Sequence, residues 1–457
     1  MKKLDFNDLK YIATALPEEV KMYKYAGDFE GEIACIDKWL KRDIPLCQKK
    51  RLEFEKLFAE GLMSDYTTDD EKLLVKLKEQ FKEADMETVN ELVRFGDVDF
   101  ILRDGKRMYQ NGALSNILNM HGAYLNSKFS PEKTSSLNRD EEFEINSRIM
   151  KERGSRAFRY EIEHTVYIDG CENMTGKKIR VWLPFPVRCE TQSDIRLLYS
   201  SHDVKITDKV MGSAYIETEF VPSDRYTVRF SYVNRAVYHE PDMSLTCIEQ
   251  PDFYTNEQLP HIQFTPFIRM LSQEIVGDEK NALEKARKIY DWITFNIRYS
   301  YLRDYLYIDN IPQFVALNRY GDCGAMSLLF ITLCRCVGIP AKWQSGNSAR
   351  PTGMGSHDWC MFYVAPFGWL YCDPSYGVGA VRNNNEAKRL YYFGNLDPFR
   401  CVTCNDFQID FEPSKNYIRM DPYDNQNGEA EFEDLNVFFD KFRHEKKVIS
   451  GEEIENL

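Results

Sequence analysis

The chain has 457 residues, 43% of them hydrophobic, and a formal net charge of −13 at pH 7. This length predicts roughly two to four domains, and the hydrophobic content excludes global disorder. The acidic charge balance argues against nucleic-acid binding, which requires a basic surface.

The amino-terminal segment MKKLDFNDLKYIATALPEEV carries lysines but no unbroken apolar stretch. It is therefore a poor signal peptide, and no run in the chain is long and apolar enough to span a bilayer. We expect a cytoplasmic protein without membrane contacts, although a secreted chain that had lost its signal would look the same. The 12 cysteines lie mostly in apolar segments, which predicts free, buried thiols.

Residues 1–152 predict an α-helical domain. Apolar side chains recur there at helical spacing in three groups: Ile33, Ile36 and Leu40; Phe54, Leu57, Phe58 and Leu62; Leu74, Leu77 and Phe81. The first two groups suggest paired antiparallel helices. The polar segment 127–142, which contains Pro131, predicts a linker after the helices.

The hydrophobic period changes to two over residues 156–250, which predicts a small antiparallel β-domain. The alternation is clearest over 158–168, 179–185 and 226–232. Because the odd and even residues of a strand face opposite sides, one side of each strand is expected to be buried.

Residues 257–400 return to helical spacing and then to strand-like segments. One apolar stripe predicts a helix and consists of Ala282, Ala286, Ile289, Ile293 and Ile297. The segments WCMFYV and GWLYCD read as strands. We expect residues 401–457 to form a carboxy-terminal extension that packs on this domain, with the acidic stretch DPYDNQNGEAEFEDLNV at the surface.

Cys323 stands where a loop becomes an apolar helix, in NRYGDCGAMSLLFITLCRCVGIP. Apolar residues follow it at helical spacing, and a glycine and a proline then end the helix. The amides and the dipole at a helix start favour negative charge and lower the pKa of a thiol. The flanking Gly321 and Gly324 leave room for a substrate, so Cys323 is a candidate nucleophile.

A cysteine nucleophile needs a base and a group that orients the base. His357 lies in GSHDWCMFYV and Asp373 in GWLYCDPSYG. If these segments are neighbouring strands, Asp373 can accept from one imidazole nitrogen while the other nitrogen faces the sulfur. Taken singly, the residues have simpler interpretations as a core cysteine, a loop histidine and an Asp-Pro turn. Their order and spacing together favour a Cys-His-Asp triad.

The segments GDCGAMSLLFITLCRCVGIPAKWQSG and HDWCMFYVAPFGWLYCDPSYG resemble the core of the transglutaminase-like superfamily. In that family a Gly-x-Cys opens a helix that ends in Gly-Ile-Pro, His-x-Trp lies on a strand, and Gly-Trp followed by Asp-Pro lies on the next. The resemblance is specific over about 260–400 and absent over 1–150. Over 156–250 it is looser and concerns the β-domain that precedes many bacterial members. It implies a papain-like α+β fold, with Cys323 as nucleophile, His357 as base and Asp373 as the orienting carboxylate.

One position departs from the family pattern. Many members carry an acidic residue two places after the tryptophan of His-x-Trp, and this chain has Met361 there. Since that position is outside the triad, we interpret the change as a difference in substrate or packing.

The resemblance implies that Cys323 attacks an amide carbonyl of a peptide or glutamine side chain and forms a thioester. Water would then give a protease or amidase, which we slightly favour, and an amine would give a cross-linking or transfer enzyme. The Cys323 backbone N–H and a second donor would stabilise the oxyanion. Candidates for the second donor are Gln313, Tyr299 and Trp292, and candidates for the substrate groove are Trp359 and Trp343.

Two other functions are compatible with the sequence. The fold can serve as a binding or scaffold module without chemistry, although the intact Cys, His and Asp argue against this. A deglycosylating amidase would need paired Cys-x-x-Cys zinc ligands ahead of the nucleophile, and this chain has none there. Cys401 and Cys404 have metal-ligand spacing but no second pair follows. We therefore expect no metal or cofactor, a peptide or protein substrate, and a possible protein partner at the helical domain.

Overall fold

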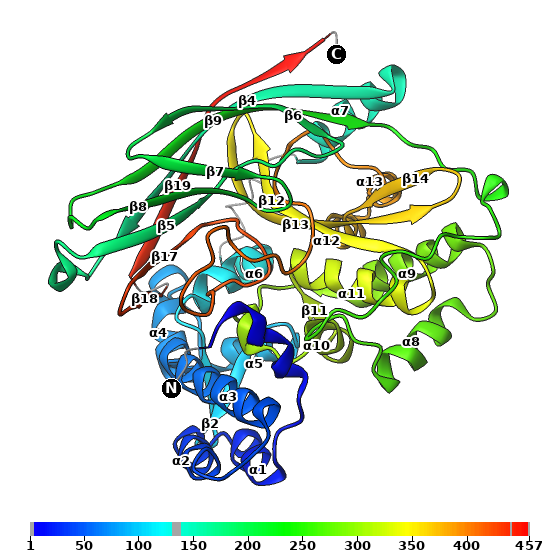
Figure 1. Cartoon of the computed structure of the whole chain (residues 1–457). Coiled ribbons are helices and arrows are strands. Elements are labelled where there is room, and N and C mark those ends of the chain that lie inside the picture. Colours follow the sequence, from blue (N-terminus) through cyan, green and yellow to red (C-terminus); the bar gives the residue numbers. More distant parts are fainter. Residues whose placement is uncertain (1–3, 130–138, 439–440, 456–457) are drawn as a thin grey trace.

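The computed structural model describes residues 4–129, 139–438 and 441–455 and combines helices and sheets in the predicted α+β class. Figure 1 shows the amino-terminal helices (blue) at one end, a β-rich part (green) and a part with helices beside a sheet (yellow). Within the described ranges, no helix has both the length and the apolar character needed to cross a membrane. The centre of the predicted linker, residues 130–138, lies outside the described residues.

The amino-terminal part is mainly helical, as its apolar spacing predicts. Its helices are η1 (Phe6–Ala13), α1 (Glu18–Ala26), α2 (Phe29–Trp39), α3 (Leu46–Asp65), α4 (Asp70–Gln80), α5 (Met86–Arg94) and α6 (Ala113–Phe129). A small antiparallel sheet lies among them and consists of β1 (Thr68–Asp69), β3 (Lys106–Tyr109) and β2 (Phe100–Arg103). These strands are too short to give a period-two signal, so the sequence did not predict them.

Helix α7 (Arg139–Arg153) packs away from the other amino-terminal helices. Its Phe143 shares an apolar cluster with Tyr391 and Tyr392, and Glu142 accepts from Arg350 Nε at 2.8 Å. The predicted helical domain, residues 1–152, therefore includes α7, although α7 packs against residues later in the chain.

The β-domain contains two antiparallel sheets, with strand orders β19-β4-β9-β6 and β18-β17-β5-β8-β7. Its early elements are β4 (Ser155–Ile168), η2 (Glu172–Met174), β5 (Lys178–Pro184), β6 (Gln192–Ser200), β7 (Val204–Asp208), β8 (Gly212–Glu219) and β9 (Tyr226–Val237). Its late strands are β17 (Glu429–Phe432), β18 (Asn436–Val437) and β19 (Phe442–Ile454). Alternate side chains of β4 and β9 fill its apolar core, as the period of two predicts.

We expected residues 401–457 to form an extension that packs on the domain formed by residues 257–400, but their strands are divided between that domain and the β-domain. Strand β16 (Arg400–Cys404) belongs to the sheet of the third part, whereas β17 pairs with β5 and β19 with β4 (Figure 1). The acidic stretch is also largely buried. Its Glu429 can be buried because it forms ion pairs with Lys415 at 2.8 Å and Arg419 at 2.9 Å. The partners of these acids lie earlier in the chain, so local composition misled the prediction.

The third part places helices against a sheet of order β15-β14-β13-β12-β16. Its helices are η3 (Met243–Leu245), α8 (Pro266–Val276), α9 (Ala282–Asn296), η4 (Tyr305–Tyr307), α10 (Ile311–Asn318), α11 (Cys323–Cys336), α12 (Pro374–Arg382) and α13 (Glu386–Tyr391). Its other strands are β10 (Arg298–Tyr299), β11 (Tyr320–Gly321), β12 (Ala341–Arg350), β13 (Gly353–Val364), β14 (Gly368–Cys372) and β15 (Phe393–Gly394). Strands β10 and β11 form a separate parallel pair.

Strand β13 presents different residues to the two sides of its sheet. Cys360, Phe362 and Val364 share the apolar cluster that contains α11. Trp359 and Met361 belong to a different cluster, together with Tyr371 and Val402. This alternation determines on which side of the sheet each functional side chain lies.

Candidate active site

Cys323 is the first residue of α11, as the sequence predicts. The preceding Asp322 caps the helix, because its side chain accepts from the Ala325 N–H at 3.1 Å. Helix α11 is buried from Cys323 to Arg335. Its position in the core therefore fixes the cysteine at the end of the sheet formed by β12, β13 and β14.

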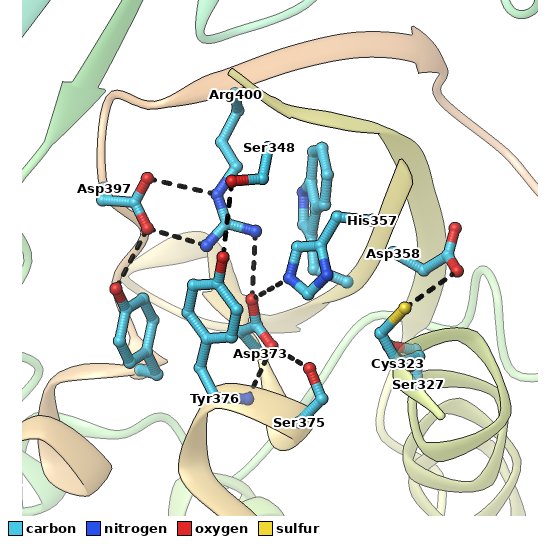
Figure 2. Close-up of polar contacts among 12 residues, drawn as sticks. Cys323, Ser327, Ser348, His357, Asp358, Asp373, Ser375, Tyr376, Asp397 and Arg400 are labelled. Atoms are coloured by element: carbon cyan, nitrogen blue, oxygen red, sulfur yellow. Dashed lines mark hydrogen bonds and ion pairs between the residues drawn. The ribbon is translucent and has the colours of Figure 1, made fainter. Parts of the chain in front are cut away.

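His357 and Asp373 form the expected pair. Strands β13 and β14 are antiparallel neighbours, with Cys360 opposite Cys372, and Asp373 follows β14 directly. The His357 Nε2 and Asp373 Oδ2 atoms are 2.7 Å apart. Figure 2 shows the imidazole pointing at this carboxylate. The remaining ring nitrogen, Nδ1, is then an acceptor in the tautomer that donates to Asp373.

Four groups donate to the Asp373 carboxylate. Its Oδ2 accepts from His357 and from Arg400 Nη1 (3.0 Å), and its Oδ1 accepts from the Ser375 hydroxyl (2.9 Å) and the Tyr376 N–H (3.0 Å). Burial would raise the pKa of Asp373, but the charges of His357 and Arg400 and these hydrogen bonds bring the pKa below its ordinary value. The pKa of His357 is also lowered, mainly by burial. The pair is therefore a neutral imidazole on an ionised carboxylate.

Arg400 completes this arrangement and was not predicted from the sequence. Its Nη2 donates to Asp397 Oδ2 at 2.7 Å, while Nη1 reaches Asp373 (Figure 2). Its guanidinium lies 4.9 Å from the ring centroid of Trp359 and 4.8 Å from that of Tyr376. Such stacking and bidentate pairing fix a buried arginine in one orientation. No local motif around Arg400 indicates this role.

The Cys323 sulfur contacts Asp358, the neighbour of His357 on β13. The thiol donates to Asp358 Oδ2 across 3.3 Å (Figure 2). Because consecutive strand residues face opposite sides, Asp358 points toward α11 while His357 shares a side with Trp359. Among the described residues, the hydrogen bond of the sulfur is to Asp358, and the expected contact with His357 stays a prediction.

The expected lowering of the thiol pKa is wrong for this conformation. Burial, and then the carboxyls of Asp358 and Asp322, raise the pKa of Cys323 well above its ordinary value. Burial removes the water that would solvate a thiolate, and both neighbours are acidic. The helix start therefore holds a neutral thiol here.

The segment between β16 and β17 lies over this site. Gln426 donates through Nε2 to Asp358 Oδ1 and to the His357 carbonyl oxygen. Asn427 Oδ1 accepts from the Ser356 hydroxyl at 3.0 Å. Only 9% of Cys323 and 6% of His357 is exposed to solvent. The conformation is therefore a closed one.

The three candidates for the second oxyanion donor are placed differently. Gln313 Oε1 accepts from the Thr265 hydroxyl at 2.7 Å, and the Trp292 ring packs under the Arg319 guanidinium at 4.6 Å. Tyr299 lies near the nucleophile, because burial and then a negative charge on Cys323 raise the pKa of Tyr299. Among the described residues, Gln313 and Trp292 thus contact Thr265 and Arg319 and not the sulfur.

Two further predictions concern side chains in the core. Trp359 and Trp343 are 0% and 1% exposed, so neither lines an open groove in this conformation. The Trp359 indole donates to Gln344 Oε1 at 2.6 Å, which is a packing role. Cys401 and Cys404 belong to two different apolar clusters, which is not the arrangement of a metal clamp.

Comparisons with known proteins find one family model that matches part of the chain. Residues 269–374 match the family model of the Transglutaminase-like superfamily, a span that includes Cys323, His357 and Asp373. Over 129 residues the chain is 24% identical to the uncharacterized protein YebA of Bacillus subtilis, covering 24% of this chain and 17% of YebA. It is 27% identical over 174 residues to an uncharacterized protein of Haemophilus influenzae, covering 30% of this chain and 46% of that protein. The chain thus spans less than half the length of these curated relatives.

Two solved structures are also similar. A proposed cysteine protease from Cytophaga hutchinsonii is 14% identical, with a TM-score of 0.41 over 65% of this chain and 91% of that one. The periplasmic domain of TgpA from Pseudomonas aeruginosa is 14% identical, with a TM-score of 0.27 over 52% of this chain and 93% of that one. Residues 269–374, which contain the motifs around Cys323, His357 and Asp373, are therefore similar to the transglutaminase-like superfamily.

Proposed function

We propose that this chain is a cysteine enzyme that takes an acyl group from an amide through a thioester on Cys323. His357 is the base and Asp373 the orienting carboxylate. The observation that carries the proposal is the buried His357–Asp373 pair, in which Nε2 is bound at 2.7 Å and Nδ1 is left as the acceptor. A histidine without a catalytic role would not need an ionised, four-fold hydrogen-bonded carboxylate to fix its tautomer.

The reaction requires a rearrangement that brings the thiol from Asp358 to His357, because the Asp358 and His357 side chains lie on opposite sides of β13 here. The thiol then gives its proton to His357 Nδ1. The sulfur attacks the amide carbonyl carbon, a C–S bond forms, and the carbonyl electrons move to oxygen. When the oxyanion collapses, the C–N bond breaks and the proton on Nδ1 goes to the departing amine. Since Cys323 is 9% exposed, a peptide or protein substrate also needs the segment over the site to move.

We propose hydrolysis over transfer as the second half of the reaction. With p-nitrophenyl acetate as acyl donor and a primary amine such as glycine ethyl ester present, we expect free acetate to be the main product. Cys323→Ala should form neither product above background, and Cys336→Ala serves as the control for loss of a thiol elsewhere on α11. Acylated amine as the main product would instead assign a transferase. A wild-type protein that behaves like Cys323→Ala would favour the scaffold function.

A further inference from the structure

We propose that Asp358 is a further catalytic residue, which as a neutral carboxylic acid donates the second hydrogen bond to the oxyanion formed by attack of Cys323. This inference rests on the acyl-transfer function proposed above and assigns the donor that the sequence left open. The first donor is the Cys323 backbone N–H at the start of α11.

The position of the carboxyl supports this role. Asp358 Oδ2 is 3.3 Å from the Cys323 sulfur, and a Cβ added to Gly324 would lie only 2.7 Å from the same oxygen. The carboxyl therefore lies directly over the first turn of α11, beside the sulfur. In a tetrahedral intermediate the oxyanion is two bonds from the sulfur, so a group beside the sulfur is within reach of an oxyanion that points to the same side.

The hydrogen bonds of Asp358 indicate which oxygen carries the proton. Gln426 Nε2 donates to Oδ1, so Oδ1 acts as an acceptor. Asp424 also forms a hydrogen bond with the Asp358 carboxyl, which partly offsets the rise that burial causes in the pKa of Asp358. We place the proton of Asp358 on Oδ2, the oxygen that faces Cys323. In the resting site the thiol donates to Oδ2, and once the thiol has lost its proton to His357, Oδ2 can become the donor.

The surroundings favour the neutral form of Asp358. The titratable groups that face it are Asp322 and Cys323 at the start of α11, Tyr299 on β10, Tyr305 on η4, Asp421 and Asp424 on the segment over the site, and Lys446 on β19. Burial, and then the charge of Asp322, raise the pKa of Asp358 to about 8. The carboxyl is therefore protonated at neutral pH and can donate, as a buried acid in an apolar site can elsewhere.

No atom is gained or lost at Asp358 during the reaction. The thiol proton goes to His357 Nδ1 and later to the amine, while the Asp358 proton stays on Oδ2 and only changes its partner. As the C–S bond forms, the oxyanion accepts from Oδ2 and from the Cys323 N–H. Both hydrogen bonds weaken when the carbonyl forms again and the C–N bond breaks.

The test compares two reactions of the same sulfur. Acylation by p-nitrophenyl acetate passes through an oxyanion, whereas alkylation by iodoacetamide does not. Asp358→Leu removes the donor, and we expect it to lower the rate of acylation about 100- to 1,000-fold while the rate of alkylation changes far less. Asp358→Asn is the matched variant, since its oxygen can accept from Gln426 and its N–H can donate. It should keep most of the acylation rate.

The pH dependence gives a second readout. Below its pKa of about 8 Asp358 can donate, and above it the carboxylate cannot. In the wild type, the ratio of acylation rate to alkylation rate should therefore fall as the pH rises through about 8. In Asp358→Asn the ratio should stay constant. Dividing by the alkylation rate removes the effect of the thiolate fraction.

Two results would overturn the role of Asp358. One is an unchanged ratio in a folded Asp358→Leu variant, and the other is an equal loss of both rates, which would mean that Asp358 acts on the thiol alone. If Asp358→Leu does not fold, the test is the pH dependence of the acylation-to-alkylation ratio in the wild type and in Asp358→Asn. A ratio with the same pH dependence in both proteins would overturn the role of Asp358. Failure of the proposed function looks different, because the wild-type Cys323 would then be alkylated but never acylated.

Discussion

Asp373→Asn is expected to slow acylation of Cys323 by about 10,000-fold in a chain that still folds. An amide can present an N–H to His357 Nε2, and the imidazole then keeps its proton on Nδ1. It can no longer accept the thiol proton, although its position is unchanged. Arg400 retains Asp397, so one counter-charge for the buried guanidinium remains.

The rate is measured from p-nitrophenol release in a single turnover, with circular dichroism to check the fold. Ser375→Ala is the matched control, because it removes a hydrogen bond from Asp373 Oδ1 but leaves the Oδ2 contact with His357. It should cost far less than Asp373→Asn. An Asp373→Asn variant that is as active as Ser375→Ala would remove Asp373 from the catalytic machinery.

Arg400→Met is expected to have the largest effect on stability and to lower the free energy of unfolding by about 3–5 kcal/mol. The substitution leaves the Asp373 and Asp397 carboxylates buried without the cation that both contact. It also removes the guanidinium that packs between Trp359 and Tyr376. Urea unfolding followed by tryptophan fluorescence measures the change.

The control is Arg443→Met, which breaks an exposed ion pair with Asp169 at 3.0 Å. An exposed pair contributes about 0–1 kcal/mol, so this variant should unfold almost as the wild type does. Equal losses in the two variants would contradict the structural role of Arg400.

The stability of Arg400→Met should also depend on pH differently from that of the wild type. The pKa of Asp373 in the folded chain lies below its ordinary value. Its ion pairs therefore stabilise the fold above the unfolded pKa of about 3.9, and this contribution is lost as the pH falls toward the folded pKa. Without Arg400 the folded pKa of Asp373 rises, so the stability lost in Arg400→Met relative to the wild type should be largest at neutral pH and should shrink as the pH falls below about 4.

The sequence predicted those parts of the site that local patterns encode. Cys323 begins a helix because a cap residue and apolar spacing are adjacent to it. His357 and Asp373 meet because a short turn pairs their two strands. These features depend on adjacent residues or on two segments joined by a short turn, and a single sequence records them.

The rest of the site depends on contacts that the sequence does not record. Asp358 meets Cys323 from 35 residues away, and Gln426 meets Asp358 from 68 residues away. Arg400 lies on β16, an edge strand of the same sheet, and contacts Asp373 from 27 residues away. Without an alignment these residues carry no local signal. The raised pKa of the thiol follows from burial, from Asp358 and from the adjacent Asp322.

The same reason explains the carboxy-terminal part of the fold. Acidic residues such as Glu429 and Glu431 look solvent-exposed by composition, but Lys415, Arg419 and Arg180 neutralise them in the folded chain. Strand β19 pairs with β4, which lies far earlier in the sequence. Such long-range pairing is beyond the reach of periodicity.

The central claim is that His357 activates Cys323 as an acyl-accepting nucleophile. The most direct measurement is to treat the protein with limiting p-nitrophenyl acetate, quench in acid and map the acetyl thioester by peptide mass spectrometry. We expect acetyl on Cys323 in the wild type and a rate about 100- to 10,000-fold lower in His357→Ala. Acetyl mainly on the exposed Cys47 and Cys247, or equal acetylation of Cys323 in both proteins, would contradict the account.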